Sequence, residues 1–454
     1  MSDLAFLSIA EGARRIAAGT LSPAAWIEAL LERIARHDPV LHSFITVRAD
    51  HARAAARAAE RAIAATGWRG ALQGVPICLK DAIATAGVRT TAHSRLLVDH
   101  VPARSATLVD RLERAGAIVL GKNALYEFCY GGPSFDLPWP PARNPWNLAR
   151  VAGGSSSGTA AAIAYGLAAG GIGTDTGGSI RQPASFCGLA GLKPTNGLVP
   201  LDGVAALSFT LDTAGPLARS AEDCAMLLDA LAGTTTTATL GRGVAGLRIG
   251  VLRHFHDGEA QASPAVAAAI DAACGVLRGL GATVGGARIA SLADLDACGR
   301  VIVLAESFAI HEAQLRRDPS VYGRIARHRF ALGGFLAAAD YAQALRQRER
   351  LTAESDRVFA DWDLLLTCGE TAAAPRFEDA AASFPFTVTP SLRIPFNVTG
   401  YPALSVCCGF DGDGMPLGLQ IAGPRGADDL VLAAGAAYER ATPWRERRPE
   451  LRPA

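Results

Sequence analysis

The sequence predicts an α/β fold, a sandwich in which helices pack against a largely buried, mixed and twisted β-sheet. Strand-like apolar segments alternate with helix-like segments along the chain, and 50% of its 454 residues are hydrophobic, enough for a large core. No internal repeat, low-complexity tract or long linker divides the chain. We therefore expect a single domain over residues 1–454, with the helices of residues 1–68 packed on its core.

The first predicted elements are two helices. Ser22 and Pro23 are typical of an N-cap and a first helical residue, and the apolar residues that follow recur at helical spacing. These apolar residues are Ile27, Leu30, Leu31 and Ile34. A second, alanine-rich helix is expected over residues 50–65.

A short buried strand is expected next, over residues 74–79, with Lys80 at its end. A helix that begins at Ser105 and ends at Gly116 then leads into a strand over residues 117–120. Together this helix and strand form an αβ unit.

The middle of the chain has a less regular pattern. Residues 133–152 are rich in proline and tryptophan and have no usable period, so we expect an ordered loop there. Residues 160–173 are rich in alanine and glycine and fall short of the ~18 apolar residues that a membrane span needs, which predicts a buried, tightly packed helix.

The C-terminal half is expected to add core strands, the last two joined by a hairpin turn. These strands are residues 248–252, 364–367, 403–410 and 417–422.

Charge and cysteine patterns exclude several classes of partner. The formal net charge is +1 and no block of like charges occurs, so neither nucleic acid nor an anionic membrane is an expected partner. The nine cysteines form no C-x-x-C pair and no zinc-type cluster, which predicts free thiols and no metal site. Residues 1–19 lack the features of a signal peptide. We therefore expect a cytoplasmic protein that acts on a small, neutral or weakly charged molecule.

Lysine is rare in this chain: three of its 44 basic side chains are lysines, namely Lys80, Lys122 and Lys193. An arginine stays protonated in a protein, whereas the amine of a desolvated lysine can lose its proton and act as a base. Chance and the slimmer stem of lysine account for these positions equally well. Each lysine is therefore a candidate for a base and also for ordinary packing.

Two glycine-flanked segments, GGSSSG at 153–158 and GTDTGGSIR at 173–181, place Ser155 and Ser179 24 residues apart. Glycine lets backbone N–H groups approach a ligand, as in an anion cradle or in an oxyanion hole beside a nucleophile. The phosphate-binding motifs G-x-x-x-x-G-K and strand-linked G-x-G-x-x-G are absent. Glycine turns that only pack a helix against a sheet are the structural alternative.

A serine nucleophile needs a base that takes its proton. Residues 154–158 match the G-x-S-x-G nucleophile elbow of α/β-hydrolases, but that elbow follows a strand, whereas residues 144–152 are expected to be loop, and no suitable histidine lies near the C-terminus. His254 and His256 are expected to be solvated in a loop. The remaining base is a lysine, since Ser–Lys arrangements are a known variant of the triad. Spacing alone does not choose among the three lysines.

At this point the motifs resemble those of the amidase signature family. GGSSSG at 153–158 followed by GGSIR at 177–181 is similar to the family's defining segment. Further similar stretches are GVP at 74–76 with KD at 80–81, GKN at 121–123, NPW at 144–146, GLKPT at 191–195 and GLQ at 418–420. The resemblance covers nearly the whole chain and implies a single α/β/α domain around a large mixed sheet.

The resemblance also implies a Ser–Ser–Lys triad that needs no metal or cofactor. Ser179 would be the nucleophile, Ser155 the bridging serine after a cis Gly154–Ser155 peptide bond, and Lys80 the base. Backbone N–H groups would form the oxyanion hole, those of Thr176, Gly177, Gly178 and Ser179.

Supporting roles follow from the same resemblance. Lys122 and Lys193 are expected to be structural, Ser156 to hold its loop by hydrogen bonding, and Arg181 to order the turn of the nucleophile.

Tyr130 and Gly131 lie where relatives line the substrate pocket. Few lysines and an aromatic loop around Tyr130 and Trp139 favour an uncharged aryl or alkyl amide, ester or carbamate (urethane) as the substrate.

Residues 330–341 resemble the stand-alone hydrolases, and the 136–141 run departs from the amidotransferase pattern. The alternatives are the glutamine-hydrolysing A subunit of a tRNA-dependent amidotransferase and a ureido or carbamate acid hydrolase. A homodimer is common among such relatives.

Overall fold

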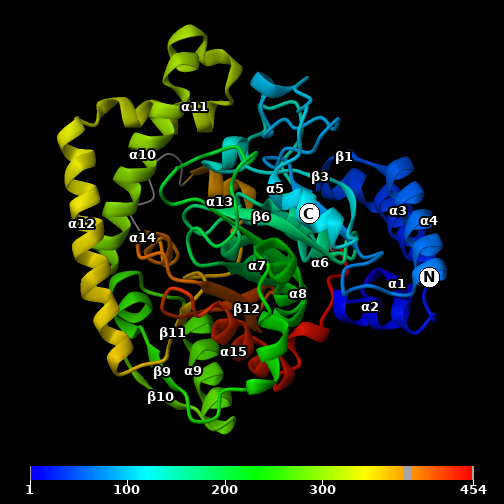
Figure 1. The fold of residues 1–454 in the computed structure, drawn as a ribbon. Helices are drawn as coiled ribbons and strands as arrows, with labels where there is room; N and C mark the ends of the chain where they lie inside the picture. Colours follow the sequence, from blue (N-terminus) through cyan, green and yellow to red (C-terminus); the bar gives the residue numbers. More distant parts are fainter. Residues whose placement is uncertain (1, 383–389, 452–454) are drawn as a thin grey trace.

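The computed structural model of this protein describes residues 2–382 and 390–451, which fold around an 11-stranded sheet (Figure 1). In sheet order the strands are β1 (Phe44–Val47), β3 (Ile118–Asn123), β2 (Pro76–Lys80), β6 (Gly170–Asp175), β8 (Thr213–Ala218), β7 (Ala190–Lys193), β12 (Ala403–Phe410), β13 (Pro416–Ala422), β11 (Leu364–Cys368), β9 (Arg248–Val251) and β10 (Thr283–Gly286). The runs β3-β2-β6 and β11-β9-β10 are parallel, and all other neighbours are antiparallel. The sheet is therefore mixed, as predicted.

Helices cover both faces of this sheet. One group consists of α6 (Ser157–Ala164) and α7 (Arg181–Cys187), and the other of α8 (Ala221–Ala232), α9 (Pro264–Gly279) and α15 (Asp428–Arg440). A Cβ atom on Gly170 of β6 would meet Leu227 of α8, whereas one on the next residue, Gly171, would meet Thr159 of α6. Successive residues of a strand point to opposite faces, so α6 and α8 lie on opposite faces.

The remaining helices flank the sheet. They are α1 (Ser2–Ala5), α2 (Ile9–Ala17), α3 (Pro23–Leu41), α4 (Ala49–Thr66), α5 (Thr107–Arg114), α10 (Leu292–Arg317), α11 (Arg324–Leu332), α12 (Ala338–Asp356), α13 (Phe377–Ala382) and α14 (Pro395–Val398). Figure 1 shows the N-terminal helices and the α10–α12 group on opposite sides of the molecule. In the described part of the chain, no helix combines the length and hydrophobicity that crossing a membrane requires.

Most predicted elements lie where the sequence indicated. The hydroxyl of Ser22 accepts a hydrogen bond from the Ala25 N–H at 3.1 Å and Pro23 opens α3, which is the predicted cap. Helix α4 packs against α3 and β3. The expected strands also form, with ends shifted by a few residues: β2, β3, β9, β11, β12 and β13.

The prediction of one helix over residues 160–173 is wrong in its second half. Helix α6 ends at Ala164, and strand β6 begins at Gly170. A Cβ atom on Gly171 would lie 2.7 Å from the Cys78 carbonyl oxygen, and one on Gly173 would lie 2.6 Å from the Ser156 hydroxyl. These glycines belong to strand β6, which neighbouring segments approach too closely for side chains. The strand was not predicted because its alanine- and glycine-rich surroundings have a composition typical of a helix.

The prediction of a loop over residues 133–152 is also wrong in part. Strands β4 (Arg143–Asn144) and β5 (Asn147–Val151) form a small antiparallel hairpin, whose turn is held by the Asn144 side chain bonding the Trp146 N–H at 3.0 Å. A strand therefore does precede the first serine loop, contrary to the argument used against a nucleophile elbow. This strand belongs to a separate two-stranded sheet, and the last histidine of the chain is still His328.

Candidate active site

Lys80 occupies the end of β2, beside the end of the parallel strand β6. The carboxyl ends of parallel strands meet at one edge of a sheet, so Lys80 and Thr174 converge there. The fully buried Lys80 Nζ lies 2.7 Å from the Ser155 Oγ and 2.7 Å from the Thr174 Oγ1. The lysine and the bridging serine of the predicted triad are therefore in direct contact.

Burial lowers the pKa of Lys80 below its ordinary value, because the charged ammonium loses its hydration. The nearby groups Cys129, Asp212 and Asp175 oppose this shift, but burial is the largest cause. A neutral amine at this position has a lone pair with which it can accept a proton from a hydroxyl.

The loop before α6 presents Ser155. The Gly154–Ser155 peptide bond is cis, as the resemblance implies. The Gly154 N–H donates to the side-chain oxygen of Gln182 at 3.1 Å, and the Ser155 carbonyl accepts from the Tyr126 N–H at 3.1 Å. A Cβ atom on Gly154 would lie 2.2 Å from the Tyr126 ring, so only glycine fits at this position.

A fully buried ion pair organises the turn that carries Ser179. The Asp175 carboxylate accepts from the Gly178 N–H at 2.7 Å and pairs with the Arg181 guanidinium at 2.8 Å. Burial alone would raise the pKa of Asp175, but Arg181 and hydrogen bonds from Asn397 and Ile180 hold it well below its usual range. Arg181 therefore orders this turn, as the sequence indicated.

Ser179 lies in the wall of a cavity of about 770 Å³ that Ser155 also lines. The Ser156 N–H donates to the Ser179 carbonyl at 3.2 Å and so ties the two serine loops together. Ser156 also bonds β6, with its hydroxyl 3.3 Å from the Thr174 carbonyl oxygen. Within residues 2–382 and 390–451, the Ser179 hydroxyl makes no hydrogen bond. The structure thus forms one link of the predicted relay and leaves the nucleophile candidate beside the cavity.

The predicted oxyanion hole needs one correction. The Gly178 N–H already donates to Asp175 and is not available to an oxyanion. Among the described residues, no acceptor engages the N–H groups of Thr176, Gly177 or Ser179, and all three residues line the cavity. The Thr176 hydroxyl donates to the Asp212 carboxylate at 2.5 Å, which fixes this side of the turn.

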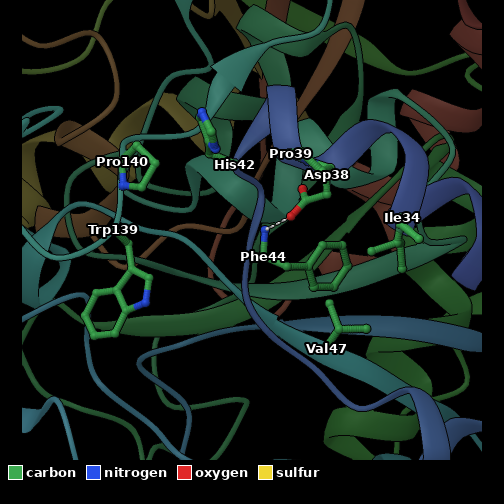
Figure 2. Close-up of a pocket in the computed structure, with 9 residues that line it drawn as sticks. Ile34, Asp38, Pro39, His42, Phe44, Val47, Trp139 and Pro140 are labelled. Atoms are coloured by element: carbon green, nitrogen blue, oxygen red, sulfur yellow. Dashed lines mark hydrogen bonds between the residues drawn. The ribbon is translucent and has the colours of Figure 1, made fainter.

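Tyr130 and Gly131 line the same cavity, but Trp139 does not. The Tyr130 ring packs against Phe330, with ring centroids 5.8 Å apart. Figure 2 shows Trp139 in a different hollow, of about 310 Å³, which Phe44 also lines. Trp139 therefore adds no apolar surface to the cavity that Ser179 lines.

Charged side chains of the cavity wall were missed by sequence reasoning. They are Asp296, Arg300, Arg329, Glu370 and Arg393. None belongs to a motif, and all are far along the chain from the serine loops, so only the folded topology brings them to the cavity. The small number of lysines therefore does not make the wall of this cavity free of charge.

The other two lysines have structural surroundings. Lys122 Nζ lies 3.0 Å from the Asp81 carboxylate, with both side chains fully buried. Lys193 Nζ donates to the Pro194 carbonyl at 2.7 Å, and burial lowers its pKa to about 7.

The prediction of a solvated His256 is wrong, because its buried ring bonds the Thr367 hydroxyl at 3.1 Å.

All nine cysteines are buried and unpaired, as predicted. In the part of the chain that the structure describes, no group of three or more His, Cys, Asp or Glu side chains is arranged to hold a metal ion.

Residues 25–432 match the family model described as Amidase. This chain belongs to the amidase family. It is 37% identical to the A subunit of the glutamyl-tRNA(Gln) amidotransferase from Synechococcus sp. (strain CC9311), over 98% of this chain and 99% of that protein. The family resemblance found in the sequence is confirmed, and the protein is an amidase-family enzyme.

Solved structures of amidases share the fold. The peptide amidase from Stenotrophomonas maltophilia superimposes with a TM-score of 0.85 and 30% identity, over 98% of each chain. A bacterial aryl acylamidase superimposes with a TM-score of 0.88 and 26% identity, over 97% of each chain. The large mixed α/β architecture is therefore shared with enzymes named for quite different amides.

Proposed function

We propose that this protein hydrolyses the C–N bond of a small amide through an acyl-enzyme on Ser179, and that it does so without other protein chains. Ser155 relays the proton, Lys80 is the base, and no metal takes part. One observation carries this proposal most directly: the buried amine of Lys80, whose pKa burial lowers, lies 2.7 Å from the Ser155 hydroxyl at the cavity that Ser179 lines.

The proposed reaction begins when the Ser179 oxygen attacks the amide carbonyl carbon. The Ser179 proton passes to Ser155, whose own proton passes to Lys80. Substrate binding closes the Ser179–Ser155 link, since catalytic hydrogen bonds are often long or absent before substrate arrives. The N–H groups of Thr176, Gly177 and Ser179 hold the oxyanion; one such donor is worth ~3–4 kcal/mol in other enzymes.

Collapse of the tetrahedral intermediate breaks the C–N bond. The relay returns the proton to the departing nitrogen, which leaves as a neutral amine or as ammonia. Water then attacks the ester carbonyl, gives its proton to Lys80 by way of Ser155, and releases the acid product. The regenerated Ser179 hydroxyl recovers its proton from the same relay, so that protons balance over the cycle.

A second candidate function is glutamine hydrolysis as the A subunit of an amidotransferase. The 37% identity to such a protein over nearly the full length of both chains favours it. Both candidates use the same amide chemistry and differ in the substrate and in the need for partner proteins. Fold similarity does not choose between them.

The test is an assay of the purified, partner-free protein against p-nitroanilides, aryl acylamides, carbamates and glutamine. We expect turnover of at least one amide or carbamate other than glutamine, and a loss of ~10³-fold or more in Ser179→Ala and Lys80→Ala. Weak turnover of glutamine alone would favour the amidotransferase function. Full activity of Lys80→Ala would refute the assignment of the base.

A further inference from the structure

An ion pair between Arg393 and Glu370 lies in the wall of the cavity that Ser155 and Ser179 line. The two side chains keep 15% and 16% of their surface exposed. Neither residue was singled out by a sequence motif, and the relay proposed above does not use either of them.

The pair is attached to both serine loops. The Gln182 side chain donates to Glu370 Oε1 at 3.2 Å and accepts from the Gly154 N–H at 3.1 Å. On the other side, a Cβ atom on Gly178 would lie 2.3 Å from Arg393 Nε, so the arginine rests directly on the turn of the nucleophile. The ion pair therefore lies next to the point at which a bound amide would react.

Each member of the pair keeps hydrogen-bonding capacity for a ligand. The bond from Gln182 and the contact with Arg393 both use Glu370 Oε1. Among the described residues, no partner is found for Glu370 Oε2 or for Arg393 Nη2. Two residues that line the cavity thus keep one acceptor atom and one donor atom for a ligand.

This combination selects among substrate groups. A planar amide or ureido group offers a C=O to the guanidinium and an N–H to the carboxylate, so both are satisfied at once. A carboxylate would suit Arg393 but would be repelled by Glu370, and an ammonium would meet the opposite conflict. An apolar chain would cover these two half-buried polar groups without giving them new partners, which is unfavourable.

We propose that the Arg393–Glu370 pair determines specificity by binding a second amide or ureido group in the acyl part of the substrate. This inference rests on the proposed amide hydrolysis and names the class of amide. Substrates that carry such a group, for example acylated amino-acid amides, are bound at both ends. Simple alkyl amides bind only at the reacting carbonyl.

The test compares N-acetylglycinamide with pentanamide, which has the same chain length but no second amide. We expect the wild type to prefer N-acetylglycinamide in kcat/KM by about 10-fold or more, because a site built for hydrogen bonds rejects an analogue that lacks them. Glu370→Gln and Arg393→Met should each reduce this preference severalfold, because they lower kcat/KM for N-acetylglycinamide more than kcat/KM for pentanamide. Arg248→Met, which removes a solvent-accessible ion pair between Arg248 of β9 and Asp363, is the matched control and should leave the preference unchanged.

The outcomes are distinguishable. Equal losses for both substrates in the two pocket variants would mean that the pair only supports the serine loops, which overturns the inference. A wild type that hydrolyses both amides without preference overturns it as well, while the proposed function stands. A wild type as inactive as Ser179→Ala on every amide tested would remove the proposed function, and the inference with it.

Discussion

At the scale of the residue, the three lysines show how surroundings decide a role. All three side chains are fully buried, and burial lowers the pKa of each. Lys122 contacts a carboxylate, and Lys193 donates to two amide carbonyl oxygens, which have no proton to give. Lys80 instead lies beside two hydroxyl groups, those of Ser155 and Thr174. A hydroxyl does not hold a proton on the amine as a carboxylate does. Lys80 is therefore the lysine best placed to be a neutral base.

This environment predicts the pH dependence of activity. Only the neutral form of Lys80 can accept a proton, and its pKa lies below the usual 10.5. We expect kcat/KM to rise with pH through that lowered pKa and then level off. Lys80→Arg should be inactive throughout, because arginine stays protonated. Activity of this variant at any pH between about 6 and 10, with an unchanged circular dichroism spectrum, would contradict a proton-accepting role for the residue.

The buried pair of Asp175 and Arg181 predicts a large effect on stability. Removing one partner of such a pair leaves an uncompensated buried charge and costs ~3–5 kcal/mol. We expect Arg181→Met to lower the free energy of unfolding by about this amount in urea titrations. The exposed Arg248–Asp363 pair is the control, and Arg248→Met should cost ~1 kcal/mol or less. Similar losses in the two variants would mean that the buried pair is not what holds the turn.

At the scale of the element, glycines mark where helices and strands come too close for a side chain. Gly12 of α2 packs on the buried ring of Trp26 in α3, and its Cβ position lies 2.1 Å from that ring. Gly275 of α9 has open space at the same position, with no atom within 4 Å. Both glycines are inside helices, so they form a matched pair.

The two glycines predict opposite effects of the same substitution. Gly275→Ala should stabilise the protein by ~1 kcal/mol, which is the helix propensity difference. Gly12→Ala should destabilise it by ~1–3 kcal/mol, because the Trp26 ring must move. Thermal unfolding of both variants measures this. Stabilisation by both would show that α2 and α3 are not packed as closely as the structure has them.

The close packing at glycines also explains why some elements could be predicted from the sequence and strand β6 could not. Helix α3 and strands β2, β12 and β13 carry clear caps, apolar periods or turns, and they form as expected. Strand β6 has a glycine at three of its first four positions, so it carries few side chains that could show a period of two. This segment forms a strand because it pairs with β2 on one side and β8 on the other. Pairing of this kind cannot be read from a local sequence pattern.

At the scale of the whole molecule, the sheet order assembles the site from distant segments. Lys80 and Thr174 meet because β2 and β6 are parallel neighbours, although 94 residues separate them in sequence. Lys80, Ser155 and Ser179 lie in local motifs, and the resemblance of these motifs to those of the family predicted their roles. Glu370 and Arg393 reach the cavity only through the order of the C-terminal strands, and no local pattern marks them.

The most direct measurement of the central claim is the mass of the acyl-enzyme. The protein would be mixed with p-nitrophenyl acetate, quenched in acid, and analysed by intact and peptide mass spectrometry. We predict one acetyl group on Ser179, none in Ser179→Ala, and slower labelling in Lys80→Ala. Acetylation of another residue, such as Ser155 or Cys129, or equal labelling of Ser179→Ala, would show that Ser179 is not the nucleophile.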